Sequence, residues 1–295
     1  MLLQRGDRGP EVRELQRRLG ELDYHVGPAD GIFGPMTEQA VRAFQDDRGL
    51  MVDGIAGPMT LGELGLADEE GDGPGETDQP DPGPVRHRCG ELEADREVLA
   101  RSIARAAERE RERWHRNGTK RETDPKMSPV LRDYFATGIG RTVTDEEVQD
   151  EDWQRANPWS AAFISWVVCS AGGGDAFAYH AAHQHYIAAA KRNREAGDRD
   201  NPFWAYRVSE RGLRVGDIVC AERRDSGASF ENIDQRFRAC HCDVVTMVTA
   251  DQVIVVGGNV GDTVDTKTLQ LDRRGRIDLS GRQSRFFAIV SVLGD

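Results

Sequence analysis

The sequence predicts two domains: a small all-α domain of three helices at residues 1–66, and an α+β domain at residues 91–295. Three observations lead to this prediction. An eight-residue motif occurs twice near the start of the chain, a strongly acidic segment follows it, and the rest combines one very apolar helical segment with short β-branched runs. A buried helix packed on an antiparallel sheet is the simplest arrangement for those last elements.

The repeated motif defines the first domain. Residues 30–37 read DGIFGPMT, and residues 53–60 read DGIAGPMT. Each Asp-Gly favours a tight turn, and each Gly-Pro favours the start of a helix that the threonine can cap. Apolar residues at helical spacing predict the helices themselves; these are Val12, Leu15 and Leu19, then Ala40, Val41, Phe44 and Leu50.

This domain resembles the peptidoglycan-binding domain 1 family along its whole length. The resemblance rests on Gly6-Asp7, Gln16, Leu19, residues 30–34, Thr37, Ala40-Val41, Phe44-Gln45, Gly49-Leu50 and residues 52–54. It implies binding to cell-wall glycopeptide, with no chemistry in the domain itself. We take the turn that contains Asp30 and Phe33 as the candidate contact with the wall. A generic three-helix interaction module is the alternative.

Residues 67–90 are interpreted as a linker. Residues 67–84 contain seven acidic residues, four prolines and four glycines. Such a segment buries almost nothing and repels itself, so it should act as an extended tether. A tether would keep the second domain at high effective concentration near the wall.

Composition restricts the partners and the location. A net charge of −12 argues against nucleic acid as the main partner, because phosphate binding requires a basic surface. No apolar run is long enough to span a membrane, and residues 1–7 lack the apolar core of a signal peptide. We therefore expect a monomer that reaches the bacterial cell wall, in the periplasm or outside the cell, through release or a dedicated secretion machine.

The second domain begins with a predicted helix at residues 91–117, with Leu92, Leu99, Ile103, Ala107 and Trp114 facing inward. Residues 118–152 look loop-rich. A largely buried helix then starts at Pro158 or Trp159 and places Ser160 in its first turn. Unpaired backbone amides and the helix dipole favour negative charge there, which suits a nucleophile and its oxyanion, and equally suits a capping serine. Strands are predicted at residues 216–220, 241–248, 252–259 and 286–292.

The order of these elements resembles the NlpC/P60 and CHAP-type papain-fold wall hydrolases, and within them the DUF2272 group. The matching pieces are Pro158-Trp159-Ser160-Ala161-Ala162-Phe163, then residues 216–219, His241 and Gly257-Gly258-Asn259. The likeness covers about residues 92–293 and implies a papain-like domain. It also implies that Ser160 stands where the family carries its nucleophilic cysteine.

Serine needs a base that removes its proton during attack, whereas cysteine is partly ionised near neutral pH. The resemblance assigns that role to His241, with Asn259 orienting the imidazole. Some CHAP-type sites carry a glutamate two residues before the asparagine, where this chain has Gly257. Asp243, on the same strand face as His241, is the alternative orienting acid. A structural serine and a turn asparagine remain the alternatives for Ser160 and Asn259.

The segment at residues 180–186 holds three of the seven histidines. We interpret it as a wall of the substrate groove, with Trp159, His180, His185 and Tyr186 as candidate contacts; structural or solvated histidines are the alternative. The five cysteines do not follow the spacing of a small disulfide framework. Cys240-His241-Cys242 lacks a second ligand pair at zinc spacing, so we expect no metal and no cofactor.

These residues are compatible with three functions. The first is a hydrolase that cleaves an amide bond in peptidoglycan, either endolysin-like or a secreted effector; delivery into a rival bacterium is a variant of it. The second is a serine esterase acting on acylated wall glycan, because serine suits esters. The third is an inert domain that binds the wall and cleaves nothing.

Overall fold

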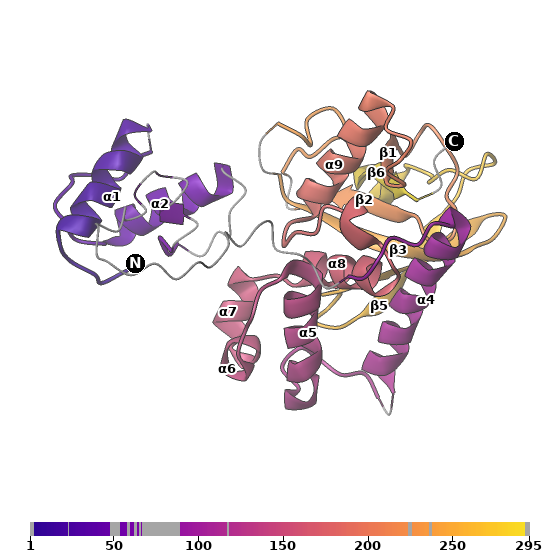
Figure 1. The fold of residues 1–295 in the computed structure, drawn as a ribbon, viewed down its shortest axis with the longest axis horizontal. Helices are drawn as coiled ribbons and strands as arrows, with labels where there is room; N and C mark the ends of the chain where they lie inside the picture. Colours follow the sequence, from indigo (N-terminus) through magenta and orange to yellow (C-terminus); the bar gives the residue numbers. More distant parts are fainter. Residues whose placement is uncertain are drawn as a thin grey trace, which may run out of the picture. The chain divides into compact units, whose positions relative to one another are not determined.

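The computed structural model describes residues 3–22, 24–47, 54–57, 60–61, 64, 66, 89–116, 118–223, 226–235 and 238–292. The chain divides into two compact units, Met1–Gly83 and Pro84–Asp295 (Figure 1). The predicted linker lies almost wholly outside the described residues. Within the described residues, no helix combines the length and the apolar character that crossing a membrane requires.

The first unit contains α1 (Pro10–Glu21) and α2 (Pro35–Asp47). The predicted apolar face of α1 is buried, and so are Ala40, Val41 and Phe44 on α2. The helical character predicted for this region is therefore confirmed. Most of the predicted third helix lies outside the described residues, and so does Leu50.

Two buried glutamines explain why the motif repeats. The Gln16 amide nitrogen donates to the carbonyl of Ile32, and its oxygen accepts from the Gly31 amide at 2.8 Å. Gln45 makes the same pair of bonds one motif later, with the Ile55 carbonyl and the Gly54 amide. Each glutamine thus satisfies the buried backbone of one Asp-Gly turn.

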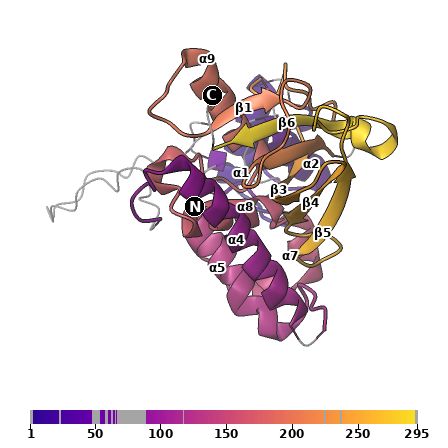
Figure 2. The ribbon, with the colours of Figure 1, turned by 90° about the vertical axis from the view of Figure 1, so that its right-hand side faces the viewer.

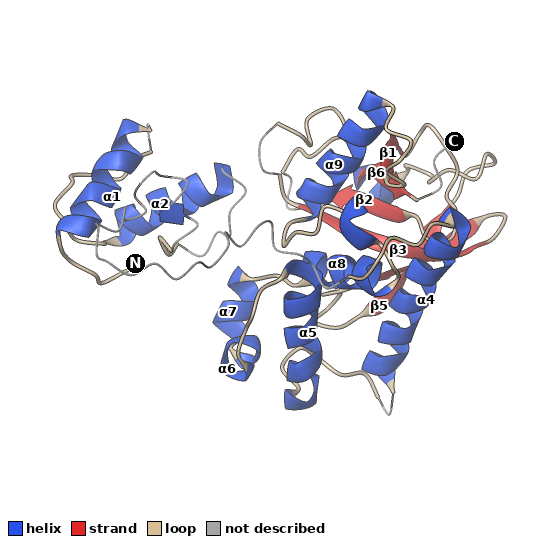
Figure 3. Cartoon of the chain, in the orientation of Figure 1, coloured by secondary structure: helices blue, strands red, loops and turns tan. Residues whose placement is uncertain are grey.

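The second unit is an antiparallel sheet with helices. Its strands are β1 (Trp204–Arg207), β2 (Ile218–Glu222), β3 (Cys240–Val248), β4 (Gln252–Gly257), β5 (Asp265–Gln270) and β6 (Phe286–Ser291), in the order β1-β6-β2-β3-β4-β5. Its helices of twelve or more residues are α4 (Arg96–His115), α5 (Ser128–Ile139) and α9 (His183–Ala196), and the buried helix is α8 (Ser160–Ser170) (Figure 3). The predicted sheet is confirmed, and β1 and β5 extend it at its edges.

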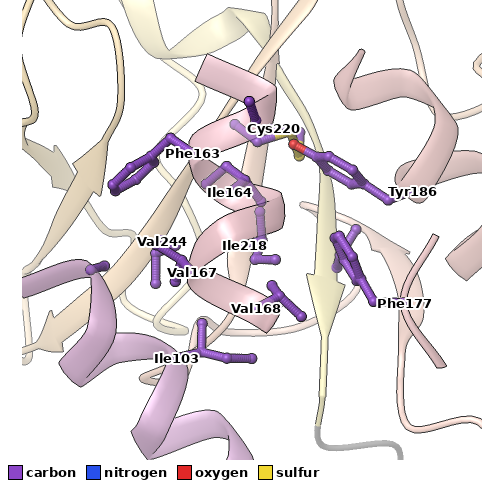
Figure 4. Packing of buried hydrophobic residues seen from close by; sticks show 14 of the residues in the cluster. Ile103, Phe163, Ile164, Val167, Val168, Phe177, Tyr186, Ile218, Cys220 and Val244 are labelled. Atoms are coloured by element: carbon purple, nitrogen blue, oxygen red, sulfur yellow. A yellow bond between two sulfur atoms is a disulfide. The ribbon is translucent and has the colours of Figure 1, made fainter. Parts of the chain in front are cut away.

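The two faces of the sheet have different covers. Cys242, Val244 and Val256 belong to the large core cluster that also contains the apolar side chains of α4, α8 and α9. Val245 and Val255, which alternate with them along the strands, belong to a smaller cluster that includes Leu213 and Ile277. Figure 4 shows Ile164, Val167 and Val168 of α8 in the large core, and Figure 2 shows the sheet from the side. The helices therefore cover one face, while connecting segments cover the other.

The region between α4 and α8 is more helical than expected. The loop-rich prediction for residues 118–152 was wrong, because α5, α6 (Asp145–Gln149) and the start of α7 (Glu151–Ala156) lie there. A side chain at Gly138 of α5 would place its Cβ 2.5 Å from the Ala162 carbonyl oxygen of α8, so these two helices pack backbone to backbone. Leu92 was also misplaced: it precedes α4 and is exposed.

Two disulfides hold the second unit together, which the cysteine spacing did not predict. One joins Cys89 to Cys169 near the end of α8, and the other joins Cys220 on β2 to Cys242 directly opposite on β3. Among the described residues Cys240 is a free, buried thiol. Both bonds therefore anchor elements that carry candidate site residues, Ser160 on α8 and His241 on β3.

Candidate functional site

Ser160 lies in the first turn of α8, as the sequence predicts, although the helix begins at Ser160 itself and not at Pro158 or Trp159; only 3% of Ser160 is exposed. The amides of the first helical turn have no partner within the helix, so they and the helix dipole favour negative charge near its hydroxyl. Trp159 precedes it in the core, where its ring stacks on Trp114 with centroids 5.1 Å apart. Its indole nitrogen donates to the carboxylate of Glu122.

The partner of Ser160 is His183, the first residue of α9. The Ser160 Oγ and the His183 Nε2 are 2.7 Å apart. The other ring nitrogen, Nδ1, is hydrogen-bonded to the hydroxyl of Tyr186 one turn along α9. Sequence reasoning noticed His183 within a histidine cluster but assigned the base to His241, because nothing local indicates that the starts of α8 and α9 meet.

His241 lies next to this pair, on β3. Its ring centroid is 5.4 Å from that of His183, with the two rings nearly edge to face. The His241 Nε2 is 3.0 Å from Oδ1 of Asp243, which is buried. Lys267 on β5 donates to both carboxylate oxygens of Asp243, at 2.9 and 3.0 Å. The predicted residues Ser160, His241 and Asp243 are thus brought together, with His183 between the serine and the second histidine.

Burial and charge set the protonation of these groups. Burial holds the pKa of His183 well below its ordinary value, His241 lowers it further, and Asp243 opposes the shift. Burial also raises the pKa of the Tyr186 hydroxyl well above its ordinary value. Burial alone would raise the pKa of Asp243, but His241 and Lys267 bring it well below the usual range. His183 is therefore neutral at neutral pH, Tyr186 keeps its proton, and Asp243 is a carboxylate.

A neutral imidazole between two hydroxyls has two tautomers. If Tyr186 donates to Nδ1, the Nε2–H of His183 donates to Ser160. If the Nδ1–H donates to the Tyr186 oxygen, Nε2 accepts the Ser160 hydroxyl proton, which is the state that general-base catalysis requires. The same heavy-atom positions fit both states, and Tyr186 keeps the ring oriented in each.

Asn259 is in the left-handed region, with φ of 58°. Among the residues that the structure describes, no hydrogen bond joins it to Ser160, His183 or His241. Its conformation is that of a turn residue after Gly257-Gly258, the alternative named above. Gly257 lacks the side chain that would meet Asp243: a Cβ there would lie 2.0 Å from Oδ1.

The candidate substrate contacts take different positions. Tyr186 and Trp159 are 1% exposed and pack in the core. His180 and His185 stack on each other, with ring centroids 3.5 Å apart, and burial with the neighbouring His185 lowers the pKa of His180 to about 4. Glu122, which sequence reasoning missed, is half-buried, and burial raises its pKa.

In the first unit, Asp30 and Phe33 have structural contacts. Asp30 accepts hydrogen bonds from the Gln16 side chain and the Ile32 amide, which lower its pKa, whereas Phe33 is buried in the core. Beside them, Ile32 and Met36 are exposed apolar side chains. Over the described residues of both units, no cluster of three histidine, cysteine or acidic side chains is arranged to hold a metal ion.

Comparisons with known proteins find relatives that are similar to a part of this chain. A spore cortex-lytic enzyme of Bacillus cereus is 48% identical over 59 residues, which cover 20% of this chain and 23% of that enzyme. The N-acetylmuramoyl-L-alanine amidase CwlM of Mycobacterium tuberculosis is 45% identical over 56 residues, or 19% of this chain and 14% of that protein. The chain thus spans less than a quarter of the length of either relative.

Two solved structures are also similar in part. The SleB N-terminal domain is 45% identical, with 23% of this chain and 92% of that chain covered and a TM-score of 0.22. The endolysin of Burkholderia phage AP3 is 26% identical, with 46% of this chain and 51% of that chain covered and a TM-score of 0.22.

Family models assign both parts of the chain. Residues 8–64 match the PG_binding_1 family of peptidoglycan-binding domains, which confirms the resemblance found in the first unit. Residues 132–288, more than half of the sequence, match a family described as uncharacterized protein conserved in bacteria. The chain therefore belongs to the DUF2272 family, with a peptidoglycan-binding domain at its N-terminal end.

Proposed function

We propose that this protein is a peptidoglycan hydrolase that binds the wall through its first unit and cleaves an amide bond there with Ser160 of its second unit. The observation that carries the proposal is the 2.7 Å contact between the Ser160 Oγ and the His183 Nε2. A serine within hydrogen-bond reach of a neutral imidazole, at the start of a helix, has the base and the oxyanion donors that nucleophilic attack needs. The match to peptidoglycan-binding domains, and the cortex-lytic enzyme and the amidase among the relatives, support peptidoglycan as the substrate class.

In the proposed mechanism Ser160 attacks the carbonyl carbon while His183 takes the hydroxyl proton through Nε2. The first-turn amides of α8 stabilise the oxyanion. His183 then gives the proton to the leaving amine, and water releases the acyl group by the reverse steps. Tyr186 orients the imidazole, and the nearby carboxylate of Asp243 favours the imidazolium that forms. In this scheme the helix and sheet act as a papain-like scaffold with serine as the nucleophile.

Mass spectrometry of the material released from purified peptidoglycan tests the proposal. The wild type should release soluble fragments. In Ser160→Ala the amount of released fragments should fall by roughly 10³-fold or more. Ser160→Cys should keep measurable activity, because a thiol beside an imidazole is a competent nucleophile. Ser170→Ala, an exposed serine at the far end of the same helix, is the matched control and should behave as the wild type.

The inert alternative has its own support in the burial of the pair. Ser160 is 3% exposed and His183 is 5% exposed, so the two side chains also fit a structural polar contact. In that case the wild type and Ser160→Ala release nothing, while both sediment with the wall. The masses of any released fragments separate the remaining options, since a peptide cut identifies an amidase or peptidase and loss of acyl groups identifies an esterase.

A further inference from the structure

The side chain of Lys267 extends over a neighbouring strand to contact Asp243 in the candidate site. It lies on β5, where it pairs with Val255 of β4, while its ammonium contacts Asp243 on β3. Strands lie about 4.8 Å apart, so this contact spans the width of β4. The side chain is 34% exposed, whereas Asp243 is 2% exposed. Lys267 is thus the solvent-side cation on a buried carboxylate.

The missing side chain of a glycine in β4 leaves room for this contact. Gly257 lies near the end of β4, and any side chain there would begin 2.0 Å from the Asp243 Oδ1. The carboxylate of Asp243 therefore fills the space that a residue 257 side chain would need.

The carboxylate of Asp243 has two hydrogen-bonding partners, His241 and Lys267. The Asp243 Oδ1 is within hydrogen-bond distance of the His241 Nε2 and accepts a hydrogen bond from the Lys267 Nζ. The Asp243 Oδ2 accepts a second hydrogen bond from Lys267. A buried carboxylate that lost one partner would leave lone pairs unsatisfied or would rotate. The orientation of His241 therefore depends on where Lys267 holds the carboxylate.

From this geometry we propose that Lys267 is a positioning residue: it fixes the Asp243 carboxylate in the space that Gly257 leaves, and so sets the orientation of His241 beside the Ser160–His183 pair. The inference deepens the proposed function and rests on it for its catalytic meaning. No substrate contact is assigned to Lys267 itself.

The charges around His241 define the expected result. Asp243 faces it from its own strand, Lys267 from β5 through that carboxylate, and His183 from α9. Arg223, after β2, adds positive charge near His183. Removing the Lys267 charge leaves Asp243 to His241 alone. The carboxylate then lacks the partner that fixes its rotation, so the His241 ring should lose its fixed orientation.

The test compares the histidine ring signals of the full-length protein by NMR at one fixed pH, with His241 assigned from His241→Gln. Lys267→Met should move the His241 ring signals, whereas Lys267→Arg, which keeps the positive charge, should leave them close to their wild-type positions. Gly257→Ala should disturb the same signals, because its methyl group displaces Oδ1. Unchanged His241 ring signals in Lys267→Met overturn the proposal.

Wall hydrolysis is the second readout. Lys267→Met should lower kcat about tenfold with KM nearly unchanged and should shift the pH profile, while Lys267→Arg restores both. A His241 shift without any change in kcat also overturns the positioning role. If the wild type cleaves no wall at all, the proposed function fails, and the NMR result still decides whether Lys267 controls His241.

Discussion

Ser160 and His183 begin two different helices, and their side chains meet at 2.7 Å across 23 residues of chain. The contact brings the start of α8 to the start of α9. Both residues are buried, so the imidazole is desolvated and its pKa lies well below the ordinary value of 6.5. That shift has consequences for both activity and stability.

Activity should persist in mild acid. A base is useful only when unprotonated, and the lowered pKa of His183 keeps it neutral as the pH falls through 6.5. A histidine with the ordinary pKa would lose about tenfold of its neutral form by pH 5.5. We expect fragment release at pH 5.5 to stay within about twofold of that at pH 7. A tenfold fall centred near pH 6.5 would instead identify a solvated histidine as the base.

The same shift should make stability depend on pH. Below pH 6.5 the unfolded chain binds a proton at residue 183, whereas folded His183 does not until its lowered pKa is reached. The stability that neutral His183 contributes to the folded protein is therefore fully present above pH 6.5. It is lost as the pH falls toward the pKa of His183 in the folded protein. Urea unfolding at several pH values measures this slope. His183→Gln should reduce the slope, while Asn259→Ala serves as a control that leaves it unchanged.

Substitution of each histidine decides which one is the base. His183→Gln should lower kcat by about 10²- to 10⁴-fold, the usual contribution of a general base. His241→Gln should lower it by about tenfold, because it removes only the neighbour that links Asp243 to the site. The opposite ranking would favour the assignment of His241 that the family resemblance implies. Denaturant unfolding close to that of the wild type would show that the second unit of each variant is folded.

The sequence predicts the parts of this site better than their assembly. The apolar composition of α8 and the Asn157-Pro158 pair shortly before it locate Ser160, and the alternation on β3 places His241 and Asp243 on one strand face. These are local patterns. The meeting of α8 with α9 depends on how both helices pack on the sheet, and no spacing within residues 180–186 reveals it. The base was therefore assigned to His241, where the sequence predicts the start of a strand, and not to His183.

Long-range pairings were missed for the same reason. Lys267 lies in a short edge strand whose alternation is weak, and its partner is two strands away. Cys89 and Cys169 are 80 residues apart, and Cys220 faces Cys242 only once the register of β2 and β3 is known. By contrast, the first unit was predictable because its glutamines, turns and helices lie within one repeated motif.

The two disulfides should differ in their contribution to stability. Closing loops of 80 and 22 residues restricts the unfolded chain by about 4.5 and about 3.5 kcal/mol in the chain-entropy treatment. Replacing Cys89 and Cys169 by serine should thus cost about 1 kcal/mol more than replacing Cys220 and Cys242. Denaturant unfolding without reductant measures both. Equal losses, or a larger loss for the β2–β3 pair, would contradict the loop-length argument.

The glutamine pair of the first unit offers a prediction with a built-in control. Gln16→Leu removes the acceptor for the Gly31 amide and the donor to the Ile32 carbonyl, both buried under the first Asp-Gly turn. An unsatisfied buried group costs about 1–3 kcal/mol, so the first unit should unfold at lower denaturant concentration and the protein should sediment less with the wall. Gln45→Leu should have an effect of similar size, because Gln45 makes the equivalent bonds to Gly54 and Ile55. If only one of the two substitutions destabilises the unit, Gln16 and Gln45 do not contribute equally to its stability, although the two motifs are similar in sequence.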